Sequence, residues 1–294
     1  NNLKKGDTVY LEENGNNELI VLPKEIIEKK EDRVIVIDTD GKDPKFINRE
    51  IVTAYLNDFN IIKLTGKNIL RNTNQIKERV HKLMACEVIE QNHEYIICRD
   101  FLNIKELSFK DLFRKMDNTI RSMLYDFGNL QNERNSFPFK ERCDDINRIS
   151  FVFHRIMKSS LKDPQTNKSL KTDSFEILYW WFVANRLEYI SEGIRDIAIS
   201  LIDRQINLDP LFVDKGYKEM IELLNRLYNN VIKSFYNGDR DLAMTISDLR
   251  YIFNEKSKTL ELKFSMIKDV GVIMERFRFI VKLINVIARW VFSN

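Results

Sequence analysis

The spacing of hydrophobic residues changes twice along this chain. Residues 7–22 alternate apolar and polar side chains, with Asn14-Gly15 between two apolar runs. Alternation is the period of a half-buried strand, and Asn-Gly is typical of a hairpin turn because both residues tolerate positive φ. From residue 108 onward the apolar period is helical. The pattern therefore predicts a β-hairpin near the start and a long helical region at the end.

The segment between them, residues 31–107, predicts a small α/β domain. Short apolar runs bounded by turns indicate strands, and longer amphipathic runs indicate helices. The expected strands are 33–37, 61–64, 87–90 and 94–98, and the expected helices are 48–59 and 73–84. Thr73 is the predicted N-cap of the second helix, because its side-chain oxygen can accept a hydrogen bond from the first turn.

After Ser108, itself a predicted N-cap, six helices are expected. Their ranges are 108–133, 138–162, 171–207, 212–237, 239–261 and 264–292. Three helices followed by three more, in two sets of about 90 residues, indicate a duplicated three-helix bundle. The predicted fold is mainly α: two tandem three-helix bundles at 108–207 and 212–294, preceded by a hairpin at 1–24 and the α/β domain at 31–107.

Composition narrows the functional classes. The net charge is +3 over 294 residues. Neither half of the sequence has the concentrated positive charge that is expected of an obvious nucleic-acid binder. The cysteines Cys86, Cys98 and Cys143 form no close-spaced pair, which favours free thiols in a reducing cytoplasm. The chain opens on Asn rather than Met and a strand-like run follows at once, so we expect the natural protein to begin further upstream.

A membrane location is not expected. No apolar run approaches the roughly 18 residues that span a bilayer, and no signal peptide is visible. The best candidate, 279–292, is interrupted by Lys282 and Arg289. We therefore expect a cytoplasmic protein that is not embedded in a membrane.

The most informative polar pattern is a set of carboxylates one helical turn apart. Glu141 and Asp145 form one pair, and Glu188 and Glu192 form another, followed by Asp196. Like charges at i,i+4 disfavour a helix by roughly 0.2–0.5 kcal/mol per pair. These acids are predicted to lie opposite the apolar stripes of their helices, so they indicate either a solvated face or a surface site for a divalent or ferric cation. The predicted stripe of the 171–207 helix is Val183, Leu187, Ile190, Ile194, Ile197 and Leu201, and that of the 138–162 helix is Phe139, Ile146, Phe153, Met157 and Leu161.

Other catalytic patterns are weaker. The spacing Glu-x-x-His of a buried di-iron site occurs at Glu78 and at Glu90, but both lie in the α/β segment and not in a helical bundle. Asp239-Arg-Asp241 is better explained as a helix N-cap. A metal-carboxylate enzyme is thus the least favoured interpretation, and no catalytic residue is assigned.

The last helix has an unusual outward residue. Its apolar stripe includes Phe277 and Val281, and Glu275 lies on the polar side. One turn on, where a second carboxylate would complete a pair, stands Phe279. An outward aromatic can mark a partner surface, as can the adjacent Trp180 and Trp181, but burial between two bundles would explain these residues equally well.

Together these residues resemble the PhoU family of phosphate-signalling proteins, duplicated three-helix bundles with acidic motifs on helix surfaces. Arg186-Leu-Glu-Tyr-Ile-Ser-Glu192 resembles the family signature, and Met274-Glu-Arg-Phe-Arg-Phe279 resembles its second copy. Glu141-Arg-Cys-Asp-Asp145 is similar to the acidic motif of the preceding helix, and Ser247-Asp-Leu-Arg-Tyr251 occupies the equivalent place in the second repeat. Met116 to Asp126 is similar to the first helix of the archaeal-type branch.

The start of the chain, from Leu3 through Lys24, resembles the back half of a SpoVT-AbrB swapped-hairpin domain. Fusion of that domain to PhoU is an archaeal-type arrangement. The basic half of the swapped hairpin is absent from this sequence, which leaves Lys4 and Lys5 as weak DNA-binding candidates. In the second repeat Ile252 and Phe279 stand where the family has acids, so Asp248 and Glu275 read as remnants of a site.

The resemblance implies a non-enzymatic cytoplasmic regulator of phosphate uptake. Its bundles would bind a phosphate transporter or its sensor kinase, its hairpin would form a homodimer and contact DNA, and metal ions would bind at Glu141, Asp145, Glu188, Glu192 and Asp196. One alternative is a transcriptional regulator that acts mainly on DNA and whose bundles sense metal or phosphate. The other is the metal-carboxylate enzyme.

Overall fold

The computed structural model describes residues 4–13, 19–23, 32–67, 69–130, 135–162, 164–203 and 209–293. The predicted Asn14-Gly15 turn lies outside these residues. The chain divides into two compact units, each described by itself below. The first comprises residues 1–107 with 154–174, and the second comprises 108–153 with 175–294.

The first unit begins with the predicted hairpin. Strand β1 (Val9–Glu13) pairs antiparallel with β2 (Leu19–Pro23), with Leu11 opposite Val21. Directly opposite residues of an antiparallel pair point to the same face. Val9, Leu11, Leu19 and Val21 therefore share one apolar face of the hairpin, and all four side chains are exposed.

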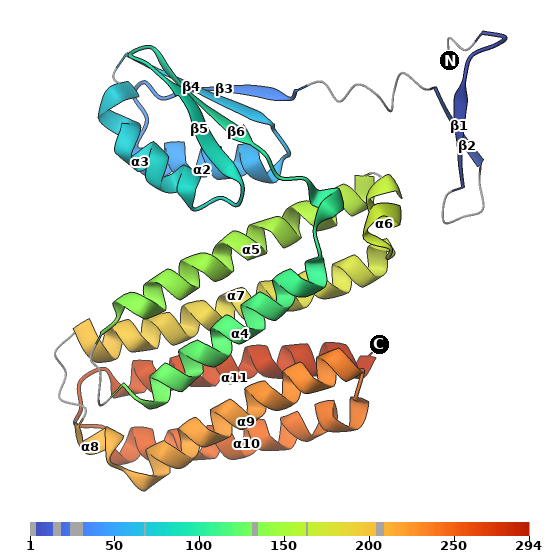
Figure 1. Ribbon diagram of the computed structural model, residues 1–294. Helices are drawn as coiled ribbons and strands as arrows, with labels where there is room; N and C mark the ends of the chain where they lie inside the picture. The colour runs from blue at the N-terminus through green and yellow to red at the C-terminus, as the bar shows by residue number, and fades with distance from the viewer. Residues whose placement is uncertain are drawn as a thin grey trace. The chain divides into compact units, whose positions relative to one another are not determined.

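The four-stranded mixed sheet of this unit has the order β3-β4-β6-β5. Its strands are β3 (Val34–Asp38), β4 (Ile61–Thr65), β5 (Cys86–Gln91) and β6 (Tyr95–Asp100). β3 and β4 are parallel, whereas β4–β6 and β6–β5 are antiparallel. Helices α2 (Pro44–Leu56) and α3 (Ile69–His81) lie on one face of the sheet, over its buried Ile62, Leu64 and Ile96 (Figure 1).

The prediction for α3 was wrong at its start. The helix begins at Ile69, so Thr73 is not an N-cap but a buried residue of the second turn. Its hydroxyl donates to the Ile69 carbonyl oxygen at 3.4 Å. Threonine can form this backward bond inside a helix as well as a cap, and the sequence does not distinguish the two.

The helical region follows a short 3₁₀ turn, η1 (Ile104–Glu106). Within the described residues it has six long helices: α4 (Phe109–Gly128), α5 (Phe137–Lys162), α7 (Ser174–Asp203), α9 (Lys215–Asn237), α10 (Arg240–Lys263) and α11 (Val270–Ser293). Two short helices not predicted as separate, α6 (Pro164–Leu170) and α8 (Asp209–Phe212), precede α7 and α9. The predicted fold class is confirmed: a mainly helical C-terminal region follows a small mixed four-stranded α/β region.

The predicted caps explain where two helices start. Ser108 accepts a hydrogen bond from the Asp111 amide and caps α4. Asp239 accepts from the Leu242 amide at 2.9 Å and caps α10, directly after Gly238 ends α9 in a left-handed conformation. The interpretation of Asp239 as a cap is therefore confirmed.

The core stripe predicted for α7 is confirmed, because all six residues are buried: Val183, Leu187, Ile190, Ile194, Ile197 and Leu201. The stripe predicted for α5 fails at its end, where Leu161 is 65% exposed. Residues 154–162 of α5 group with the sheet of the first unit, and they bury Arg155 and Ile156 instead. Because α5 contributes to two cores, its buried face changes along its length. A single hydrophobic stripe therefore predicts the buried residues of only one part of the helix.

Within the second unit, aromatic side chains connect the two sets of helices. Trp180 on α7 packs edge-on against Phe113 on α4 and Phe235 on α9, with ring centroids 5.0 and 4.8 Å apart. Phe182 on α7 stacks on Trp290 of α11 at 4.3 Å. Of the two explanations left open for Trp180, packing between the helix sets is the one observed. No helix in the described ranges combines the length and the apolar character required to cross a membrane.

Candidate functional site on helices α5 and α7

The predicted acidic residues lie along the packed helices α5 and α7. Glu188 on α7 differs most from expectation, because its carboxylate accepts a hydrogen bond from the Ser150 hydroxyl of α5 and is not fully outward. Burial raises the pKa of Glu188, the neighbouring charge of Glu192 adds to the rise, and the Ser150 hydrogen bond opposes it. Glu188 is thus a half-buried acid whose ionised form is disfavoured.

Arg195 supplies positive charge to the other acids of α7. Its Nη2 lies 2.9 Å from Asp196 Oδ1, and its Nη1 lies 4.0 Å from Glu192 Oε1. Burial works against the charged form of Arg195, but Cys143 and the carboxylates outweigh it and raise its pKa. The repulsion between acids one turn apart is therefore offset by a cation of the same helix.

Cys143 on α5 completes this cluster. Its Sγ lies 3.2 Å from Arg195 Nη1 and 3.7 Å from the Ser191 hydroxyl. Burial raises the pKa of the Cys143 thiol, although Arg195 and Ser191 oppose the rise. A fully buried thiol with a raised pKa has little thiolate at neutral pH, so it is a packing residue and not a nucleophile.

The first acidic pair remains on the surface. Glu141 is exposed, and Asp145 is half exposed with Arg148 Nη1 at 3.9 Å from its carboxylate. Among the residues that the structure describes, no three His, Cys, Asp or Glu side chains form a group that could hold a metal ion. With Arg195 beside Glu192 and Asp196, the present arrangement does not fit a cation site, and metal binding stays a prediction.

The second-repeat remnants do not form an acidic pair. Asp248 on α10 and Glu275 on α11 are both exposed, as are the apolar residues Ile252 and Phe279. Lys4 and Lys5, the weak DNA-binding candidates, are exposed just before β1.

The sequence pattern did not single out the buried charged residues Asp117 and Arg155. Asp117 on α4 accepts hydrogen bonds from Arg121 Nε at 2.8 Å and from the Tyr228 hydroxyl of α9 at 3.0 Å. The spacing of Asp117 and Arg121 at i,i+4 is a signal for such a pair, but the burial of Asp117 is not readable from sequence. No sequence pattern indicated that Arg155 is buried, because it is one basic residue within an amphipathic helix.

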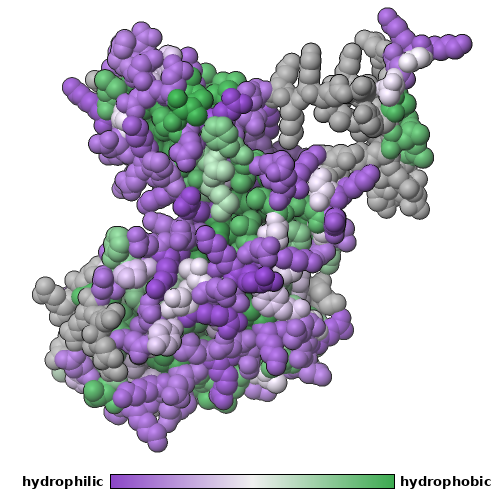
Figure 2. All heavy atoms as spheres, in the orientation of Figure 1, coloured by the Kyte–Doolittle hydropathy of each residue, from purple (hydrophilic) through white to green (hydrophobic). Residues whose placement is uncertain are grey.

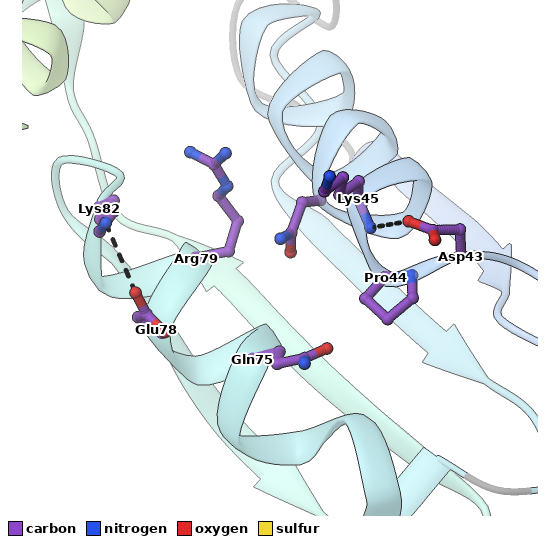
Figure 3. A pocket seen from close by; sticks show the side chains of 8 residues that line it. Asp43, Pro44, Lys45, Gln75, Glu78, Arg79 and Lys82 are labelled. Atoms are coloured by element: carbon purple, nitrogen blue, oxygen red, sulfur yellow. Dashed lines mark hydrogen bonds and ion pairs between the residues drawn. The ribbon is translucent and has the colours of Figure 1, made fainter.

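The first unit has a polar groove between α2 and α3, shown in Figure 3. Its volume is about 390 Å³, and it is lined by Asp43, Pro44, Lys45, Asn48, Gln75, Glu78, Arg79 and Lys82. Asp43 accepts from the Lys45 amide at 2.7 Å, and Lys82 lies 3.5 Å from Glu78. Of the two carboxylates, Glu78 is thus paired with Lys82 and Asp43 caps α2, which gives no reason to assign a ligand.

Comparison with protein-family models, with curated proteins and with solved structures gave no match to this chain. The cluster on α5 and α7 consists of the half-buried Glu188, the buried thiol of Cys143, and Arg195 with the two carboxylates that it neutralises. Such a cluster can hold the two helices together and present charge at the surface. No group in it is poised for nucleophilic attack.

Proposed function

We propose that this chain is a non-enzymatic regulator of phosphate uptake that acts by binding another protein, with a phosphate transporter or its sensor kinase as the partner. The proposal rests on the resemblance to the PhoU family. The observation that carries it is the order of elements: a hairpin, a four-stranded α/β region, and two successive sets of three long helices. That order is the one the resemblance implies.

The chemistry of α5 and α7 supports binding over catalysis. Arg195 neutralises Glu192 and Asp196 while these side chains remain partly exposed. Hydrophilic side chains also cover most of the helical region on the face drawn in Figure 2. Surfaces of this kind give electrostatic specificity in protein recognition.

A genetic experiment tests this proposal directly. Deletion of the gene in its own host is expected to change the rate of phosphate uptake and its response to phosphate limitation. Complementation with the unaltered chain should restore both. Uptake that is the same with and without the gene, in phosphate-rich and phosphate-poor medium, would contradict the proposal.

A second experiment separates protein binding from DNA binding. If the chain acts mainly on DNA, the affinity for its promoter should fall linearly with the logarithm of salt concentration, because phosphate contacts release counterions. Substitution of Lys4 and Lys5 by Gln should then reduce the slope. Binding too weak to measure at physiological salt would leave protein contact as the mode of action.

A further inference from the structure

The outward face of α11 carries an apolar stripe that the proposed function does not use. Val272 and Phe279 are 47% and 48% exposed, and Val286 is half-buried. The three residues are spaced seven apart, so they lie on one line of the helix surface. Residues repeated every seven positions lie on one face of a helix, as do the contact residues of helices that pack along one another.

The other side of α11 is already occupied. Ile280 approaches Gly193 of α7, where an added Cβ would lie 2.8 Å from Ile280 Cγ1. Arg276 donates to the Asp196 carbonyl oxygen and to the Ser200 hydroxyl of α7, at 2.9 and 3.0 Å. On the α10 side, Arg278 donates to Ser257 at 3.0 Å. The stripe at Phe279 therefore faces away from these contacts with α7 and α10.

The stripe is symmetric about Phe279. Val272 lies seven residues before it and Val286 seven residues after it. In an antiparallel pair of identical helices crossing at Phe279, the two phenylalanines would meet on the two-fold axis. Val272 of each helix would lie against Val286 of the other.

The charges beside the stripe have the matching symmetry with opposite sign. Glu275 stands four residues before Phe279 and Lys282 three residues after it, and both are exposed. In antiparallel helices, flanking positions on the same side of the seam face each other. Glu275 of one helix would thus lie next to Lys282 of the other, twice by symmetry. Arg276 lies on the other side of the stripe and donates to α7.

We propose that this face binds a second copy of the chain, through antiparallel packing of α11 on α11 with Phe279 on the two-fold axis. A partner of another sequence would not require the residues around Phe279 to complement themselves. The stripe is narrow compared with the roughly 1,600 Å² of a standard stable interface, so the contact alone gives a weak dimer. It is distinct from any pairing through the β1–β2 hairpin.

Disulfide trapping tests the geometry. Phe279→Cys in the full chain places two thiols on the axis, within the Cα separation of about 4.4–6.8 Å that a disulfide needs. The native cysteines Cys86, Cys98 and Cys143 are buried and do not compete. Under mild oxidation Phe279→Cys should form a covalent dimer on non-reducing gels. The matched control is Tyr251→Cys, at a 69% exposed site on α10, which should not.

Charge exchange tests the register. In the Phe279→Cys background, Glu275→Lys and Lys282→Glu should each lower the rate of dimer formation about five-fold, because each places like charges together. The double variant should restore it, whether or not the hairpin also associates. Trapping at Phe279→Cys no faster than at Tyr251→Cys, or single and double charge variants that behave alike, would overturn the proposal.

Discussion

Arg155 Nη2 lies 2.7 Å from Asp100 Oδ2, and the two side chains are only 3% and 1% exposed. Arg155 also donates from Nε to Asp58 at 2.9 Å and covers the ring of Tyr55, with 4.4 Å from Cζ to the centroid. These contacts attach the end of α5 to the α/β sheet of the first unit. The hydrogen bond that Arg155 donates to Asp100 is a main reason that the pKa of Arg155 is raised despite its burial.

Removal of this arginine should be strongly destabilising. Arg155→Met leaves Asp100 buried without its cation, and such losses cost about 3–5 kcal/mol. We expect a lower denaturation midpoint in urea, followed by circular dichroism. Arg114→Met is the control, because Arg114 pairs with Asp111 on the surface, and it should change stability by less than about 0.5 kcal/mol. Equal effects of the two variants would contradict a buried ion pair.

Glu188 should make stability depend on pH. Its pKa is raised in the folded protein, so the folded state holds the proton more tightly than the unfolded state does. Its stabilising contribution is therefore complete below the unfolded pKa of about 4.3 and is lost as pH rises through the folded pKa. Glu188→Gln removes the ionisation and keeps an oxygen that can accept from Ser150.

Glu188→Gln should consequently stabilise the protein at pH 7, and the gain should disappear as pH falls below about 4. Urea unfolding at a series of pH values measures it. Glu255→Gln, at an exposed residue paired with Lys258, provides the comparison. A stability difference for Glu188→Gln that does not vary with pH would argue against burial of the carboxylate.

Gly193 should not tolerate a methyl group. An added Cβ would lie 2.8 Å from Cγ1 of the buried Ile280. Alanine is intrinsically the better helix former by roughly 0.8–1.0 kcal/mol, but overpacking a core costs about 1–3 kcal/mol. We expect Gly193→Ala to lower the melting temperature, whereas Gly271→Ala, which meets only the flexible Glu261 carboxylate at 3.3 Å, should not. A more stable Gly193→Ala would show that α7 and α11 are less closely packed.

Tyr228 should contribute through its hydroxyl. Tyr228→Phe removes the donor to Asp117 and leaves a buried carboxylate with one bond fewer, at a cost of about 1–3 kcal/mol. Burial raises the pKa of Tyr228 well above its usual value, and the charge of Asp117 adds to the effect. Ultraviolet titration of the folded protein should show a tyrosine that ionises only on unfolding. Tyr125→Phe, at an exposed position of α4, should leave stability unchanged.

Much of the fold could be predicted from the sequence, because the patterns that indicate it involve residues close together in the chain. Ser108 and Asp239 mark helix starts because a cap is made within one turn of the chain. The stripe of α7 from Val183 to Leu201 predicted the buried face because periodicity reports burial directly. Thr73 was misplaced because its side chain can serve either a cap or a helix interior.

The sequence by itself determined the order of elements, the buried faces of most helices and the acids one turn apart, since each depends on residues near one another in the chain. Only the tertiary structure decided that Arg195 neutralises Glu192 and Asp196, that Glu188 turns toward Ser150, and that α5 changes its buried face at Arg155. The contact of Glu188 and the buried face of α5 depend on residues distant in sequence, and the contacts of Arg195 depend on its side-chain rotamer. The spacing of hydrophobic residues carries no information about distant contacts or about rotamers.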